Sequence, residues 1–137
     1  MKQSAEVTGA LVRYLEALGK GDVATIERML SNQSGLRVIG TDPREWWTGH
    51  DEVIRLFKAQ LQELGVFSVK IDAPEGYEEG SVGWGAARFT IDLGGNRIAA
   101  RISTVFHEEG GEWKVVQSHA SIGAANEEEL GKELTTA

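Results

Sequence analysis

The sequence predicts a single α+β domain over residues 1–137, in which a curved antiparallel or mixed sheet wraps around helices of the N-terminal half. Two observations predict this fold class. Apolar residues recur at helical spacing in the first half of the chain, whereas runs rich in β-branched and aromatic residues fill the second half. Helices followed by strands indicate helices packed on one face of an antiparallel sheet. The open end of such a cone is expected to be a pocket.

Three helices are expected in the first half. Residues 4–18 place apolar side chains on one helical face, and Asp22 is a suitable N-cap for a second, shorter helix. Thr48 is the expected cap of a third helix, which ends at Gly65.

The segment between the second and third helices is expected to be irregular. Residues 36–40 read as a short strand that Pro43 ends, because proline cannot donate to a strand ladder. Residues 44–47 are expected to form a turn or a short helical segment. Trp46 and Trp47 are adjacent there and cannot both face one core, so at least one is expected to line or cover a cavity.

Four long strands are expected in the second half. Residues 67–72 alternate between apolar and polar, residues 81–93 form a second strand, and residues 96–123 form a long hairpin. The hairpin carries few charges on either face, which is typical of a strand pair that is covered on both sides. We therefore place it in the middle of the sheet. Asn126 is expected to cap a last short helix.

The register of the hairpin decides which polar groups share a face. With an even number of residues in the turn loop, Arg101 shares a face with Ser118 and Ala120, and His119 lies on the other face with Ile102. With an odd number, Arg101 and His119 share a face. The turn sequence permits either arrangement.

Composition excludes several classes of function. The formal net charge of −7 disfavours binding to nucleic acid or to anionic membranes, which depends on clustered Lys and Arg. The absence of cysteine excludes disulfides and thiolate chemistry, and with the lack of a signal peptide or a membrane-length apolar run it favours a cytoplasmic protein. The three histidines are scattered, so neither a metal site nor a cofactor is expected.

Two stretches resemble a known family. Residues 111–121, Gly-Glu-Trp-Lys-Val-Val-Gln-Ser-His-Ala-Ser, preceded by Arg-Ile-Ser-Thr-Val at 101–105, resemble the C-terminal hairpin of SnoaL-like domains. These belong to the nuclear-transport-factor-2-like superfamily, which also holds ketosteroid isomerase and the association domain of calmodulin-dependent kinase. Residues 40–49 resemble the same subgroup. The resemblance implies a curved sheet, a conical pocket and a homodimer through the outer face of the sheet.

A ligand site is expected in the pocket. Arg101 lies among small and apolar residues, and its guanidinium needs an anionic partner from the protein or from a ligand. We expect the ligand, with Trp47 covering the site and Ser118 or His119 supplying a further hydrogen bond. Tyr14 projects either into this pocket or into the core.

Acid–base candidates are Asp42 and His119. Asp42 precedes Pro43, where the alternative is an Asx-type turn, and ketosteroid isomerase uses an Asp in a comparable region. For His119 the alternative is a structural or interface histidine. The leading hypothesis is binding of a small, partly apolar, carboxylate- or carbonyl-bearing molecule. The alternatives are an acid–base isomerase, cyclase or dehydratase, and a non-catalytic dimeric assembly module, because this fold hosts all of these.

Overall fold

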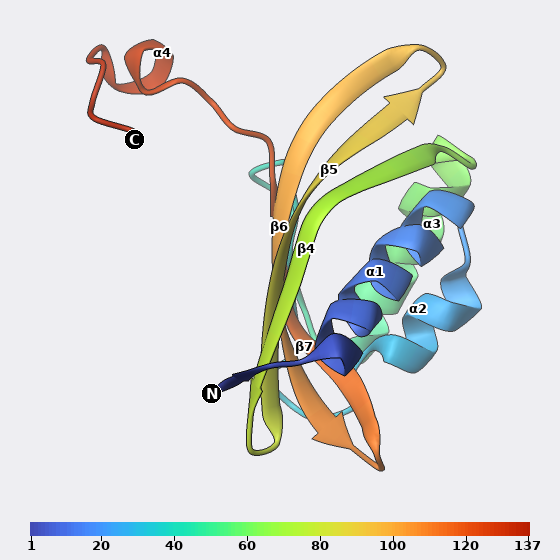
Figure 1. The fold of residues 1–137 in the computed structure, drawn as a ribbon. Helices are drawn as coiled ribbons and strands as arrows, with labels where there is room; N and C mark the ends of the chain where they lie inside the picture. Colours follow the sequence, from blue (N-terminus) through green and yellow to red (C-terminus); the bar gives the residue numbers. More distant parts are fainter.

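A computed structural model describes residues 1–137 and shows a strongly curved sheet with helices packed on one side (Figure 1). The sheet has seven strands in the order β1-β4-β5-β6-β7-β2-β3. Neighbouring strands are antiparallel except β2 and β7, which are parallel. The predicted α+β class with a curved mixed sheet is confirmed. The strands are β1 (Lys2–Gln3), β2 (Arg37–Ile39), β3 (Trp46–Thr48), β4 (Ser68–Glu79), β5 (Val82–Leu93), β6 (Asn96–Glu109) and β7 (Glu112–Ser121).

Three helices cover the concave face of the sheet, and a short fourth helix stands away from the sheet on the convex side (Figure 1). Polar side chains start the first two helices. The Ser4 hydroxyl accepts a hydrogen bond from the Val7 N–H at 3.1 Å, and the Asp22 carboxylate accepts one from the Thr25 N–H at 3.1 Å. The helices are α1 (Ala5–Lys20), α2 (Val23–Met29), α3 (His50–Leu64) and α4 (Asn126–Leu130).

The segment before α3 differs from the prediction. Residues 46–48 are the strand β3, paired antiparallel with β2, and not part of a helical turn. Thr48 is therefore the last residue of a strand and not a cap. Gly49 occupies the N-cap position of α3 with φ of 83° and without a side-chain hydrogen bond. Asn126 is likewise the first residue of α4, whose N-cap position is Ala125.

Helix α1 packs very close to β4 and β5 because glycines line the crossing. A Cβ added at Gly76 would lie 2.5 Å from the backbone nitrogen of Thr8, and one added at Gly85 would lie 3.2 Å from a methyl carbon of Leu11. The backbones can therefore approach to a distance that a side chain would prevent. The core lies between α1 and the concave face, and its fully buried members include Val7, Leu11, Leu15, Ile26, Val53, Phe106 and Val115.

A β-bulge sets the register of the central hairpin. Gly110 and Gly111, with φ of 61° and 82°, form a two-residue turn, which alone would place Arg101 and His119 on opposite faces. The register then shifts between Val105 and Phe106, where Val116 is the extra residue on β7. Beyond the bulge Ser103 lies opposite His119, so Arg101 and His119 share a face after all.

Candidate functional site

A cavity of about 270 Å³ lies between the helices and the concave face of the sheet; we call it the conical cavity. Its wall is overwhelmingly apolar, with nineteen hydrophobic residues among the twenty-four that line it. Trp47 is buried there and packs edge-to-face on Phe57 with ring centroids 5.2 Å apart. Phe57 in turn packs edge-to-face on Tyr14 at 6.4 Å. These three aromatic rings form one continuous wall.

Two buried hydroxyl groups are among the few polar groups that line the conical cavity. Tyr14 and Ser118 both line the conical cavity and are nearly fully buried. Burial raises the pKa of Tyr14 to about 12, and the adjacent Ser118 side chain lowers it by a smaller amount. The Tyr14 phenol is therefore protonated at neutral pH and can donate a hydrogen bond. Thr104 lies directly opposite Ser118 in the ladder, and its buried hydroxyl has no hydrogen-bond partner.

One carboxylate also lines the conical cavity. Glu45 accepts a hydrogen bond from the Gln60 amide at 2.8 Å and from the Asp42 N–H at 2.8 Å, one on each carboxylate oxygen. Gly40 makes room for it, since a Cβ at that position would lie 2.8 Å from the Glu45 carboxyl carbon. No lysine, arginine or histidine lines the cavity. Its only ionisable groups are thus an acid and a tyrosine.

Sequence reasoning missed Glu45 because it treated residues 44–47 as a turn or a short helical segment. In an extended segment, side chains two residues apart point to the same side. Glu45 and Trp47 therefore both face the conical cavity, while Trp46 between them is 60% exposed and lies 4.8 Å from the Arg37 guanidinium. The alternation of Glu45, Trp46 and Trp47 was the signal that could have located this acid.

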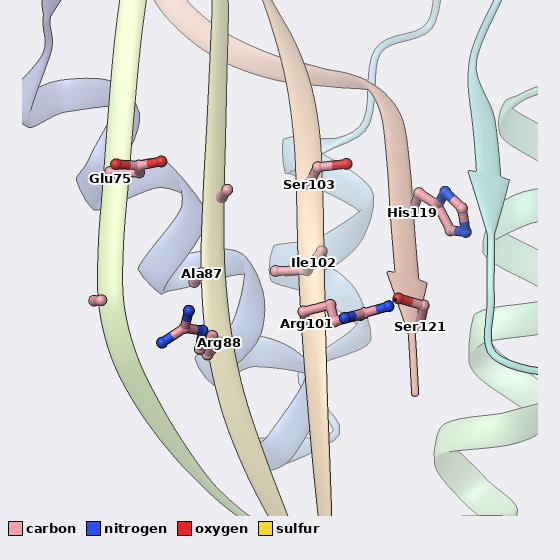
Figure 2. A pocket seen from close by; sticks show the side chains of 10 residues that line it. Glu75, Ala87, Arg88, Arg101, Ile102, Ser103, His119 and Ser121 are labelled. Carbon is pink, nitrogen blue, oxygen red and sulfur yellow. Dashed lines mark hydrogen bonds between the residues drawn. The ribbon is translucent and has the colours of Figure 1, made fainter. Parts of the chain in front are cut away.

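Arg101 and His119 do not reach the conical cavity. Both side chains are exposed on the convex face of the sheet, away from α1–α3 (Figure 2). Arg101 donates a hydrogen bond from Nε to the Ser121 hydroxyl at 3.0 Å. The five candidate ligand-site residues therefore do not line one common pocket. Tyr14, Trp47 and Ser118 meet inside the cone, whereas Arg101 and His119 meet on its outside, because the bulge at Val116 turns His119 outward.

Asp42 lies in the loop between β2 and β3 and does not line the conical cavity. Its carboxylate accepts hydrogen bonds from the Arg44 backbone N–H at 2.8 Å and from the Arg44 guanidinium at 2.9 and 3.1 Å. These bonds lower the pKa of Asp42 to about 2. The Asx-type turn that we considered for Asp42 is present, and the carboxylate nearest the ligand space is that of Glu45.

No group of three or more His, Asp or Glu side chains converges in a way that could hold a metal ion. None of the helices combines the length and the apolar composition that a bilayer crossing requires.

Comparisons with solved structures show the same fold in proteins of low sequence identity. An NTF2-like protein of unknown function from Pseudomonas putida superposes with a TM-score of 0.80 at 14% identity, covering 99% of this chain and 99% of that one. A suggested dehydratase of the NTF2-like family from Streptomyces avermitilis gives 0.79 at 18% identity, covering 88% and 95%. An NTF2-like superfamily protein from Salmonella enterica gives 0.72 at 21% identity, covering 87% and 89%.

The family follows from the sequence comparison. No curated protein sequence matches the chain. The family model of the SnoaL-like domain, however, matches residues 7–125, which include α1 from its third residue, α2, α3 and the sheet from β2 to β7. Because this match spans most of the sequence, the chain belongs to the SnoaL-like domain family.

Proposed function

We propose that the protein binds a small, mostly apolar and uncharged molecule in the conical cavity. The observation that carries the proposal is the lining of the cavity. Its walls are apolar and aromatic, and the protonated phenol of Tyr14 and the hydroxyl of Ser118 are available as hydrogen-bonding groups. A volume of about 270 Å³ lies just below the range of roughly 300–1,000 Å³ that is typical of sites for drug-sized ligands. The ligand is accordingly a compact molecule, with an oxygen that accepts a hydrogen bond from Tyr14.

The charges around the cavity argue against a carboxylate ligand. An anion buried without a partner costs several kcal/mol, and no cationic side chain lines the cavity to offset this cost. Glu45 adds a like charge in the same wall. Of the two groups anticipated from the sequence, the carbonyl group is therefore favoured over the carboxylate.

The test is a thermal-shift panel of matched pairs, such as cyclohexanone against cyclohexanecarboxylate and larger bicyclic pairs. A ligand that binds only the folded protein stabilises it by about 2.7 kcal/mol at a hundredfold excess over Kd. We expect shifts for the ketones and none for the acids. Tyr14→Phe and Ser118→Ala should reduce the ketone shifts.

Arg101→Met is the matched control, because Arg101 lies on the convex face. It should leave the ketone shifts unchanged. Carboxylate binding that depends on Arg101, or ketone binding that is indifferent to Tyr14 and Ser118, would contradict the proposal.

Glu45 supports a second function, acid–base catalysis on a bound carbonyl compound. The Glu45 carboxylate can accept a proton from the carbon next to the carbonyl while the Tyr14 hydroxyl donates a hydrogen bond to the carbonyl oxygen. With a β,γ-unsaturated carbonyl compound, Glu45 can return this proton to the γ-carbon, which gives an isomerisation. With a β-hydroxy carbonyl compound, Glu45 can give the proton to the departing hydroxyl group, which leaves as water and gives a dehydration. The suggested dehydratase among the similar structures is consistent with this class.

Deuterium exchange tests the acid–base function separately from binding. Ketones that bind should exchange their α-protons in D₂O, as followed by NMR, and Glu45→Gln should abolish the exchange without abolishing the thermal shift. Asp42→Asn is the control, since Asp42 lies outside the cavity. Ketones that bind without exchanging their α-protons would contradict the acid–base function and leave the binding function standing.

We also propose that two copies pair through their convex faces. Part of this face on the central strands carries small or apolar side chains, with Ala86 opposite Ser103 and Trp84 opposite Val105. No helix α1–α3 covers this side (Figure 1). A two-fold pairing would bury it. Sedimentation equilibrium at micromolar concentration should give twice 14.9 kDa, and a mass of 14.9 kDa would contradict the pairing.

A further inference from the structure

Two arginines lie side by side on the convex face without an acidic partner. Arg88 on β5 is directly opposite Arg101 on β6, an arrangement of like charges that destabilises a sheet (Figure 2). Neither guanidinium forms an ion pair within the chain. Asp72 is the register neighbour of Arg88 on β4, yet it too stays outside ion-pair distance. The pair is therefore available to an acid from elsewhere.

The surface around the arginines is shaped to receive a chain. A hollow of about 520 Å³ lies over the two arginines, Ser103 and His119. A second hollow adjoins it and extends past Lys70 and Ala99. Beside the two arginines these hollows are lined by the small side chains of Ala86, Ser103 and Ala99, so a segment carrying both acids and short apolar groups would fit there.

Such a segment follows β7. We call residues 122–137 the acidic arm, because they contain four glutamates and one lysine. Glu127, Glu128 and Glu129 form the first turn of α4, and Leu130 beside them is 62% exposed. In Figure 1 the arm extends from the convex side of the sheet with α4 well away from the strands. Its acids and its leucines have no partner in their own protomer.

We propose that the acidic arm of one protomer packs on the convex face of a second copy, where Glu127, Glu128 and Glu129 pair with Arg88 and Arg101. The inference rests on the proposed dimer and adds a contact that stabilises this dimer and fixes the position of the acidic arm. Charge supports it, since three acids meet two unpaired guanidinium groups, and Arg–carboxylate pairs can be bidentate. Apolar surface supports it too, because Leu130 would cover the small side chains beside the arginines.

The path of the backbone favours the second copy over the same protomer. The arm leaves β7 beside Arg101, where a Cβ on Gly123 would lie 3.6 Å from the guanidinium. From that point it runs away from the sheet, which carries α4 off its own convex face (Figure 1). In a two-fold pair each arm can reach the facing protomer without reversing direction, and the exchange is reciprocal.

A charge swap between two proteins tests the proposal. The face variant is Arg88→Glu with Arg101→Glu, and the arm variant is Glu127→Arg with Glu128→Arg and Glu129→Arg. Each alone brings like charges together in a homodimer, so its dimer Kd in sedimentation velocity should rise at least about tenfold, equivalent to about 1.4 kcal/mol. Mixed in equal amounts, the two variants restore both contacts and should form a heterodimer with roughly the wild-type Kd.

The control variant carries Glu16→Arg, Glu27→Arg and Glu63→Arg, which make the same change in charge as the arm variant, on exposed positions of α1, α2 and α3. Its dimer Kd should stay within threefold of wild type, and circular dichroism should show that all variants are folded. Face and arm variants that dimerise like wild type would overturn the arm contact and leave the dimer standing. Face and arm variants that stay monomeric when mixed would also overturn the arm contact. A monomeric wild-type protein would overturn both the arm contact and the proposed dimer.

Discussion

Replacing Gly76 by alanine should lower the stability of the protein, although alanine is the smallest possible addition. The new Cβ would lie 2.5 Å from the Thr8 backbone nitrogen, 2.8 Å from its hydroxyl and 3.0 Å from the carbonyl carbon of Val7. Two of these three atoms belong to the backbone of α1. They can move away from the new Cβ only if the whole helix shifts. Ser4 also holds the start of α1 to β4, through its N–H and the Gly76 carbonyl at 2.9 Å.

The expected loss follows from overpacking a well-filled contact, which costs about 1–3 kcal/mol. For a chain of this length each kcal/mol lowers Tm by roughly 3–5 °C. Urea unfolding should show a lower midpoint at an unchanged slope, because the surface exposed on unfolding stays the same. The displacement of α1 would also move Tyr14, so the ketone shifts described above should weaken in Gly76→Ala.

Gly9→Ala is the matched control within the same helix. A Cβ there would meet only the end of the flexible Arg13 side chain, at 3.3 Å. Alanine is favoured over glycine inside a helix by about 1 kcal/mol, so this variant should be more stable than wild type. Equal stability of Gly76→Ala and wild type would refute the close approach of α1 to β4, and with it the placement of Tyr14 over the cavity.

Three further predictions concern the loop and the cavity. Trp47→Ala should cost about 3–5 kcal/mol and Trp46→Ala no more than about 1 kcal/mol in urea unfolding, because only Trp47 is buried. The pKa of Asp42, about 2, should return toward about 3.9 in Arg44→Gln by NMR titration; since the folded pKa is lowered, its contribution to stability is complete above about pH 4 and lost as pH falls toward 2. The pKa of Tyr14, about 12, is raised above the unfolded value near 10, so the free energy of unfolding should fall between about pH 10 and 12, and Tyr14→Phe should remove that part of the fall.

The fold could be predicted from the sequence because its signals are local. The helical spacing of residues 4–18 and the Asp22 cap correspond to α1 and α2, and the two-residue Gly110–Gly111 reversal joins β6 and β7. The close crossing of α1 over β4 and β5 could not be predicted in this way. It depends on glycines that meet a helix about seventy residues earlier in the chain, and a glycine in a strand equally suits a bulge or a bend.

The candidate site was predicted only in part, for two physical reasons. A β-bulge has no reliable local signature in the sequence. The two-residue turn alone would place Arg101 and His119 on opposite faces of the sheet, and the bulge at Val116 brings them to the same face. A three-residue strand such as β3 is too short for its alternation to stand out, and so Glu45 was overlooked. Helical periodicity is enough to assign a residue such as Tyr14 to the buried face of a helix. No such local pattern assigns a residue whose facing depends on pairing with a distant strand.

The bulge at Val116 also bears on how this domain tolerates changes in length. A strand normally cannot lose a single residue, because every side chain beyond the deletion would change sides. Here β7 carries one residue more than its partner needs, since Phe106 pairs with Val115 and Val105 with Gln117. Deleting Val116, or its neighbour Gln117, would consume the spare residue and leave Ser118 facing inward and His119 outward. At this point the hairpin can therefore lose one residue while the side chains that line the cavity keep their orientation.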